Sequence, residues 1–175
     1  MSQRDLSAPM SAQDFIDQLN LEPHPEGGYY RQTYRSTQTI ARTSLPGRFA
    51  GDRFVSTAIF YLLQQGDFSA FHRIKSDECW HFYFGDTLFI HVIQQNGEYL
   101  HVKLGNDIRE AEKFQYVVPA EAWFAVEPAP GTSFALTGCT VAPGFDFADF
   151  EMGHKQSLLS LFPQHEEIID RLCRK

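Results

Sequence analysis

Residues 66–85, GDFSAFHRIKSDECWHFYFG, contain two strand-like patterns with turn residues between them. Alternation of polar and apolar residues in FSAFHRI places His72 on one face of the first strand. In the aromatic run that follows, a regular strand places Glu78, Trp80 and Phe82 on one face. We therefore expect a histidine and a carboxylate to reach one apolar cavity.

Further strands are expected along most of the chain, because short apolar or alternating runs are separated by prolines and glycines. They are residues 29–36, 54–63, 87–94, 99–104, 114–118, 123–127 and 133–141. The Asn-Gly pair at 96–97 is a strong signal for a hairpin turn. Many short strands at close spacing favour an all-β, antiparallel double-sheet jelly roll, in which closure protects the strand edges.

Helical patterns flank this expected barrel, which spans about residues 29–151. A Ser-x-x-Asp capping pattern begins a helix over about 11–20, and a proline suits the first turn of a closing helix over about 163–173. Residues 37–53 form a long, arginine-rich connection and are a candidate lid. We find no linker, so we expect one domain over 1–175.

The composition restricts the partners and the compartment of the protein. The chain has 175 residues and a formal net charge of -7. Nucleic acids and anionic membranes attract concentrated positive charge, so neither is an expected partner. The sequence has no apolar run of transmembrane length, and its first residues lack the apolar segment of a secretory signal. Three cysteines without CxxC spacing fit a reducing compartment, and we expect a cytoplasmic protein.

The spacing in the first stretch resembles the first motif of the cupin superfamily, in which glycines flank two metal-binding histidines and a glutamate. The positions that match it are Gly66, His72, Glu78 and Gly85. Ile74 stands at the position of the second histidine. The resemblance therefore implies the cupin architecture with an incomplete set of metal ligands.

Taken as a whole, the chain resembles a narrower branch, the cupin-5-like proteins that are often called predicted sugar epimerases. The stretches that carry this resemblance are PHPEGGYYRQTYRS (23–36), HRIKSDECWHFYFGD (72–86), VPAEAWFAV (118–126) and GCTVAPGFDFADFE (138–151). The second cupin motif is matched only at Pro119, because Glu121 replaces its glycine and Phe124 its histidine. The resemblance implies a cupin jelly roll that usually forms a dimer, so we expect a homodimer.

An epimerase-like reaction needs a base that removes a proton from a carbon beside a keto group, and it needs no metal. His72 is the candidate base, and Glu78 would orient its imidazole and support its charged form. The resemblance implies a tyrosine as the general acid on the opposite face of the substrate. Tyr30 and Tyr116 are the candidates, and no cofactor is expected.

Two alternatives use the same pair of residues differently. In a metal-dependent cupin enzyme, His72 and Glu78 would bind a divalent ion such as Mn, Fe, Zn or Ni, with His91 or His101 replacing a missing ligand. In a non-catalytic ligand-binding or regulatory cupin, no proton transfer occurs. His72 and Glu78 would then bond to each other or to the backbone, as buried polar groups must.

Candidates for binding a small polar or anionic ligand lie outside the central stretch. Arg31 and Arg35 share one face of a strand, and a guanidinium group suits phosphate or carboxylate. The resemblance draws attention to Asp146, whose carboxylate could bond to ligand hydroxyls. His24 and Glu26 lie in a proline-containing loop that could reach the mouth of the barrel.

Aromatic side chains could form a wall for a sugar ring, and the candidates are Trp80, Phe82 and Trp123. Together these features predict a small-molecule-binding cupin with sugar or nucleotide-sugar epimerase-like activity. The alternatives are non-catalytic binding and metal-dependent catalysis.

Overall fold

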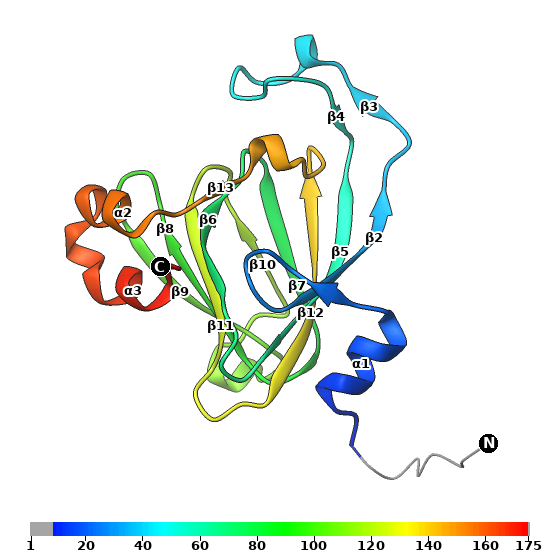
Figure 1. Cartoon of the computed structure of the whole chain (residues 1–175), viewed down its shortest axis with the longest axis vertical. Helices are drawn as coiled ribbons and strands as arrows, with labels where there is room; N and C mark the ends of the chain where they lie inside the picture. The colour runs from blue at the N-terminus through cyan, green and yellow to red at the C-terminus, as the bar shows by residue number, and fades with distance from the viewer. Residues whose placement is uncertain (1–8, 175) are drawn as a thin grey trace.

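Two antiparallel β-sheets enclose a common interior in the computed structural model, which describes residues 9–174 (Figure 1). One sheet contains, in spatial order, β1 (Glu22–Pro23), β2 (Tyr29–Arg35), β5 (Thr57–Gln64), β12 (Phe134–Ala142), β7 (Asp77–Gly85) and β10 (Gln115–Val118). The other contains β13 (Glu151–Met152), β6 (Ser69–Arg73), β11 (Trp123–Pro128), β8 (Leu88–Ile93) and β9 (Tyr99–Leu104). The expected all-β jelly roll with flanking helices is confirmed.

The central stretch of the sequence forms two strands on opposite sheets. β6 carries His72 and lies between β13 and β11, whereas β7 lies between β12 and β10. Along β7, Glu78 and Trp80 are buried and the neighbouring Asp77 is exposed. The alternation in the sequence therefore assigned the inner face of this strand correctly.

Apolar side chains from both sheets form a packed core between them. The buried members are Tyr61, Leu63, Trp80, Leu88, Ile90, Val92, Val102, Leu104, Val118, Ala122, Phe124, Val126, Ala135 and Cys139. Tyr61, Trp80 and Cys139 also line a cavity, so they form the boundary between this cavity and the packed core.

Helices cover the outer faces of both sheets. α1 (Ala12–Leu19) begins at the expected capping box and packs against the first sheet, whereas α2 (Lys155–Leu161) and α3 (Glu166–Leu172) pack on the second. The sequence predicted no helix at α2, and a 3-10 turn over Pro163–His165 precedes α3. Within residues 9–174, no helix is both long and apolar enough to cross a bilayer.

The candidate lid is a β-ribbon that extends beyond the end of the barrel (Figure 1). It contains β3 (Thr39–Ile40), the 3-10 turn η1 (Arg42–Ser44) and β4 (Arg53–Phe54). Arg53 at its base donates two hydrogen bonds to the buried carboxylate of Asp149, over 2.5 and 2.6 Å. No residue of the 37–53 segment lines the cavity, so the ribbon does not cover it in this structure.

Candidate functional site

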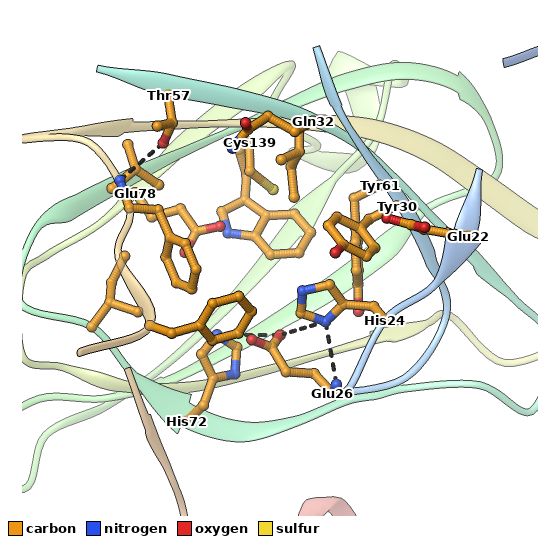
Figure 2. Close-up of a pocket in the computed structure, with 16 residues that line it drawn as sticks. Glu22, His24, Glu26, Tyr30, Gln32, Thr57, Tyr61, His72, Glu78 and Cys139 are labelled. Atoms are coloured by element: carbon orange, nitrogen blue, oxygen red, sulfur yellow. Dashed lines mark hydrogen bonds and ion pairs between the residues drawn. The ribbon is translucent and has the colours of Figure 1, made fainter. Parts of the chain in front are cut away.

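A cavity of about 220 Å³ lies between the two sheets, and Figure 2 shows its side chains. Strands of both sheets and three loops contribute to it. The lining residues are Glu22, His24, Glu26, Tyr30, Gln32, Thr57, Ile59, Tyr61, His72, Ile74, Glu78, Trp80, Cys139, Val141, Phe145 and Phe147. Four residues expected at the site, His72, Glu78, Tyr30 and Trp80, are thus brought together.

The imidazole of His72 is held in one tautomer. Its Nδ1 lies 2.7 Å from the carbonyl oxygen of Ala70. A carbonyl oxygen can only accept, so Nδ1 carries the proton and Nε2 is the unprotonated nitrogen of the neutral ring. Burial lowers the pKa of His72 to about 4, and the bond to Ala70 opposes this only in part. The ring is therefore neutral at physiological pH.

The carboxyl group in contact with His72 belongs to Glu26, in the loop between β1 and β2. Its Oε2 lies 3.5 Å from His72 Nε2 and accepts a hydrogen bond of 2.8 Å from Ser69 Oγ. Burial raises the pKa of Glu26, with a smaller opposing effect from nearby His24. The pKa shifts of Glu26 and His72 both favour the uncharged form. The contact between them is therefore between two groups whose burial disfavours an ion pair.

Backbone geometry brings the Glu26 loop into the barrel. Gly27 and Gly28 both have positive φ values, of 121° and 69°, which an L-residue rarely adopts. The Glu26 carbonyl accepts hydrogen bonds from the Arg174 side chain, over 2.6 and 3.2 Å. The Tyr61 hydroxyl donates to the Gly27 carbonyl over 2.6 Å. The sequence placed this loop at the barrel mouth but gave no signal for its contact with His72.

Glu78 enters the cavity from β7 as a protonated carboxylic acid. Burial raises its pKa to about 8, and the nearby Glu26 carboxyl adds to the rise. The Cys139 thiol is in hydrogen-bonding contact with Glu78 and opposes the rise. The sequence predicted that Glu78 would be an ionised carboxylate that orients His72. In the structure, Ala70 and Glu26 contact the imidazole instead.

One buried donor in the cavity wall has no partner. Trp80 is 2% exposed, and its indole Nε1 is the only buried side-chain nitrogen or oxygen atom without a hydrogen bond in the described part of the chain. Buried polar atoms are nearly always satisfied in folded proteins. The Trp80 N–H is therefore an unused hydrogen-bond donor on a residue that lines the cavity.

His24 and Tyr30 form an aromatic corner of the cavity. Their rings meet edge to face with centroids 4.5 Å apart, and His24 Nδ1 accepts a 3.2 Å hydrogen bond from the Glu26 backbone N–H. Burial lowers the pKa of His24, and burial and the adjacent Glu22 raise that of Tyr30. Both side chains are therefore uncharged donors at neutral pH.

The two arginines expected to clamp an anion lie outside the cavity, which corrects that expectation. Arg31 donates to the Leu19 carbonyl over 3.4 Å, and the Arg35 guanidinium stacks over the Phe54 ring at 4.7 Å. Alternation in β2 explains this placement, because Tyr30 occupies the inner face and Arg31 the outer one. Tyr116, the other candidate acid, packs against the core instead.

His91 and Trp123 also lie on the wrong face for their expected roles. His91 bonds to the Tyr99 hydroxyl (2.7 Å) and to Glu127 (3.0 Å), on the side of β8 opposite the core residue Ile90. Trp123 is buried beneath the C-terminal helices. Both β8 and β11 are covered on two faces, so buried apolar runs in the sequence concealed which side faces inward.

Two further candidates do not reach the cavity. Phe82 packs against the apolar core, and Asp146 caps a short 3-10 turn, η3 (Phe147–Asp149), by accepting from the Ala148 N–H over 2.8 Å. Of the expected aromatic wall only Trp80 lines the cavity, and Phe145 and Phe147 complete the wall.

The cavity does not fit the metal ion that the cupin architecture implies. Within the described residues, no group of three or more His, Cys, Asp or Glu side chains is arranged to hold a metal. Ile74 lines the cavity without a donor atom, and the Phe124 ring packs against His72 with centroids 4.0 Å apart. His91, the expected replacement ligand, points elsewhere. We therefore derive no metal-dependent step.

The double-sheet jelly roll with a cavity between its sheets defines a protein of the cupin class. Comparison with known families gives a match over residues 13–153 to the family described as Cupin superfamily (DUF985). The chain belongs to this family.

Two solved structures share this fold along nearly the whole chain, and a third relative matches most of the chain in sequence. A hypothetical protein from Leishmania major is 33% identical, with a TM-score of 0.85 over 95% of this chain and 100% of that chain. Protein SO0799 from Shewanella oneidensis is 37% identical, with a TM-score of 0.85 over 95% of this chain and 99% of that chain. The uncharacterized protein YML079W of Saccharomyces cerevisiae is 31% identical over 81% of this chain and 74% of its own length.

A more distant likeness is restricted to the fold. Oxalate decarboxylase from Bacillus subtilis is 15% identical, with a TM-score of 0.52, and the match covers 86% of this chain and 36% of that enzyme. The likeness shows the shared cupin architecture alone.

Proposed function

We propose that this cupin binds a small polar molecule in its barrel cavity and transfers a proton through His72, in an epimerase-like reaction. The observation that carries the proposal is the unprotonated Nε2 of a neutral imidazole, which lies beside the Glu26 carboxyl in the wall of a 220 Å³ cavity. A neutral imidazole can accept a proton from a carbon beside a carbonyl group. The proton moves from the substrate carbon to the His72 side chain, and the electron pair of the broken C–H bond stays in the substrate. The reaction therefore requires no cofactor.

Epimerisation also requires a proton donor on the opposite face of the substrate. Tyr30 supports this part of the proposal, because it lines the cavity from β2 of one sheet while His72 comes from β6 of the other (Figure 2). Its raised pKa keeps the hydroxyl protonated at neutral pH. Tyr30 is thus the proposed acid, opposite the proposed base.

The first prediction is hydrogen exchange that depends on His72. In deuterated water, the wild-type protein should introduce deuterium beside the carbonyl of at least one of L-erythrulose, deoxyxylulose, fructose or a keto nucleotide sugar. His72→Gln should reduce the rate about 100-fold or more, because it removes the base. Proton NMR of each probe, with a protein-free sample as baseline, measures the rate.

The matched control for this experiment is His91→Gln, which alters a buried histidine on the outer face of the second sheet. The control should exchange at the wild-type rate. Equal rates in wild type and His72→Gln, or no exchange with any probe, would contradict the catalytic proposal.

The second candidate function is ligand binding without catalysis, favoured by the unpartnered indole of Trp80. A binding protein would respond to a probe by an increase in its melting temperature without exchanging hydrogen. In either case we carry forward the cytoplasmic homodimer as part of the proposal. The three cysteines are all unpaired, which suits a reducing compartment.

A further inference from the structure

We infer that the cavity takes an uncharged carbonyl compound of monosaccharide size, whose carbonyl oxygen accepts hydrogen bonds from Trp80 Nε1 and from the carboxyl group of Glu78. The inference rests on the proposed function and names the class of its substrate. It also gives Glu78 a role as hydrogen-bond donor in place of the expected one.

The charges around the cavity argue against an anionic ligand. The lining includes three carboxyl side chains, those of Glu22, Glu26 and Glu78. Among the described lining residues there is neither lysine nor arginine. A phosphate or carboxylate placed there would lose its hydration without gaining a cationic partner. The absence of cationic partners disfavours sugar phosphates and organic acids.

The unpartnered donor argues against a cationic ligand as well. The indole N–H of Trp80 donates and cannot accept, so only an acceptor atom can satisfy it. A ligand ammonium group offers donors alone, whereas a carbonyl or hydroxyl oxygen accepts. The atom that meets Trp80 is therefore an oxygen of the ligand.

Glu78 supplies a second donor to the same oxygen. Its carboxyl group, like Trp80, enters the cavity from β7, and these two residues share the inner face of that strand. Burial keeps the acid protonated near neutral pH, because it raises the pKa to about 8. A neutral carboxylic acid can donate its O–H to a carbonyl oxygen, as ionised Glu could not.

Two donors on the carbonyl oxygen compensate for a weak base. The low pKa of His72, about 4, leaves its Nε2 free to accept a proton but with small affinity for it. When Nε2 takes the proton from the adjacent carbon, the C–H electron pair forms a C=C bond and the carbonyl π pair moves to oxygen. Hydrogen bonds from Trp80 and Glu78 stabilise that negative charge. A proton from Tyr30 on the opposite face of that carbon reverses the electron movements and inverts the configuration. Proton exchange with water then restores Tyr30 and neutral His72.

The volume of the cavity argues against a nucleotide sugar. Pockets for drug-sized ligands measure roughly 300–1,000 Å³, and this cavity measures about 220 Å³. Figure 2 shows His72, Glu26 and Glu78 around the same small space. A single sugar-sized molecule therefore suits it better than a sugar joined to a nucleoside diphosphate.

The second prediction concerns sets of matched probes in a thermal-shift assay. The neutral probes are L-erythrulose and deoxyxylulose, which carry an open-chain carbonyl. Their matched partners are the phosphate ester of deoxyxylulose, the reduced polyol threitol and the cation aminoacetone. We expect a neutral ketose to raise the melting temperature, and the phosphate, polyol and cation to have no effect. A response to the phosphate or to the cation, or none to either ketose, would overturn the inference.

Variants of the two donors locate the oxygen. Trp80→Phe keeps the aromatic packing but removes the N–H, and it should weaken ketose binding roughly tenfold. Trp123→Phe, which changes the other tryptophan, should bind as the wild type does. Glu78→Gln keeps an uncharged donor and should retain binding, whereas Glu78→Leu should lose it. Equal ketose affinity of Trp80→Phe and Trp123→Phe would show that the Trp80 N–H does not bind the ligand.

Failure of this inference is distinguishable from failure of the proposed function. If a neutral ketose binds through Trp80 but exchanges no hydrogen, the substrate class stands and catalysis by His72 fails. If the phosphorylated probe binds and exchanges through His72, catalysis stands and the inferred class fails.

Discussion

At the scale of single residues, the site depends on which groups remain uncharged when they are buried. His72 is neutral with its proton on Nδ1, and Glu78 is neutral because burial raises its pKa to about 8. The proposed base, His72, and the proposed hydrogen-bond donor, Glu78, are therefore both present in their working forms at neutral pH. A buried carboxyl that keeps its proton should also change how the stability of the protein depends on pH.

The third prediction follows from the sign of this shift. A Glu78 pKa raised from 4.5 to about 8 means that the folded protein binds more protons than the unfolded chain between these values. Glu78 therefore stabilises the fold fully below pH 4.5, and its contribution falls as pH rises through 8. His72, with a pKa lowered from 6.5 to about 4, acts in the opposite direction below pH 6.5.

Glu78→Gln isolates this contribution because the amide cannot ionise. Between pH 6.5 and 8, the free energy of unfolding of the wild type should fall relative to the variant by up to about 1.4 kcal/mol per pH unit. Urea denaturation at several pH values measures the difference. Parallel curves for the two proteins would show that Glu78 titrates as an ordinary carboxylate.

The sequence predicted the residues on regular strands more accurately than those in loops. His72, Glu78 and Trp80 were placed correctly because a strand directs alternate side chains to one face. The contact of Glu26 with His72 depends on positive φ values at Gly27 and on distant bonds, which have no periodic signature.

At the scale of elements, the strands of the barrel were nearly all predicted, and the wrong assignment of Trp123 follows from the helices. α2 was not expected, and together with α3 it buries the outer face of β6 and β11. Trp123 lies on the outer face of the second sheet, but the helices bury it as fully as a residue that faces the barrel interior. Periodicity cannot separate the two faces of a strand that is covered on both.

The fourth prediction concerns the link between α3 and the cavity. Arg174 follows α3 and donates to the Glu26 carbonyl, with its guanidinium over the Phe68 ring at 5.4 Å. Arg174→Ala should lower the free energy of unfolding by about 1–2 kcal/mol and weaken ketose binding. Hydrogen–deuterium exchange should accelerate at the Ala70 amide, which also bonds to Glu26.

Two variants serve as controls for Arg174. Arg109→Ala alters an arginine side chain that is 87% exposed and should change neither binding nor exchange. Arg174→Lys keeps the charge with a single donor group and should give an intermediate result. Binding by Arg174→Ala equal to that of the wild type would mean that the loop holds its position without this contact.

At the scale of the whole molecule, one edge strand of the first sheet carries exposed apolar side chains. β10 is the terminal strand of that sheet, and apolar side chains on and beside it are exposed. They include Phe114 (57%), Val117 (46%) and Tyr83 (52%). Exposed strand edges with apolar side chains are common sites of association, and this edge is the surface we propose for the homodimer.

The fifth prediction is that this edge mediates dimerisation. Sedimentation equilibrium should give twice the 20.0 kDa mass of one chain, and Val117→Glu should shift the protein to the single-chain mass. Leu161→Glu, which changes a side chain 62% exposed on α2, should remain dimeric. A single-chain mass for the wild type at every concentration would exclude the homodimer.

The bond between Arg174 and the Glu26 loop has a consequence for the order in which the protein matures during translation. All strands of the barrel precede α3 in the chain, so they emerge from the ribosome before the last helix does. The Glu26 loop receives the Arg174 contact only after α3 has emerged. In a nascent chain that is stalled before that point, the cavity would lack the contact between Arg174 and the Glu26 carbonyl.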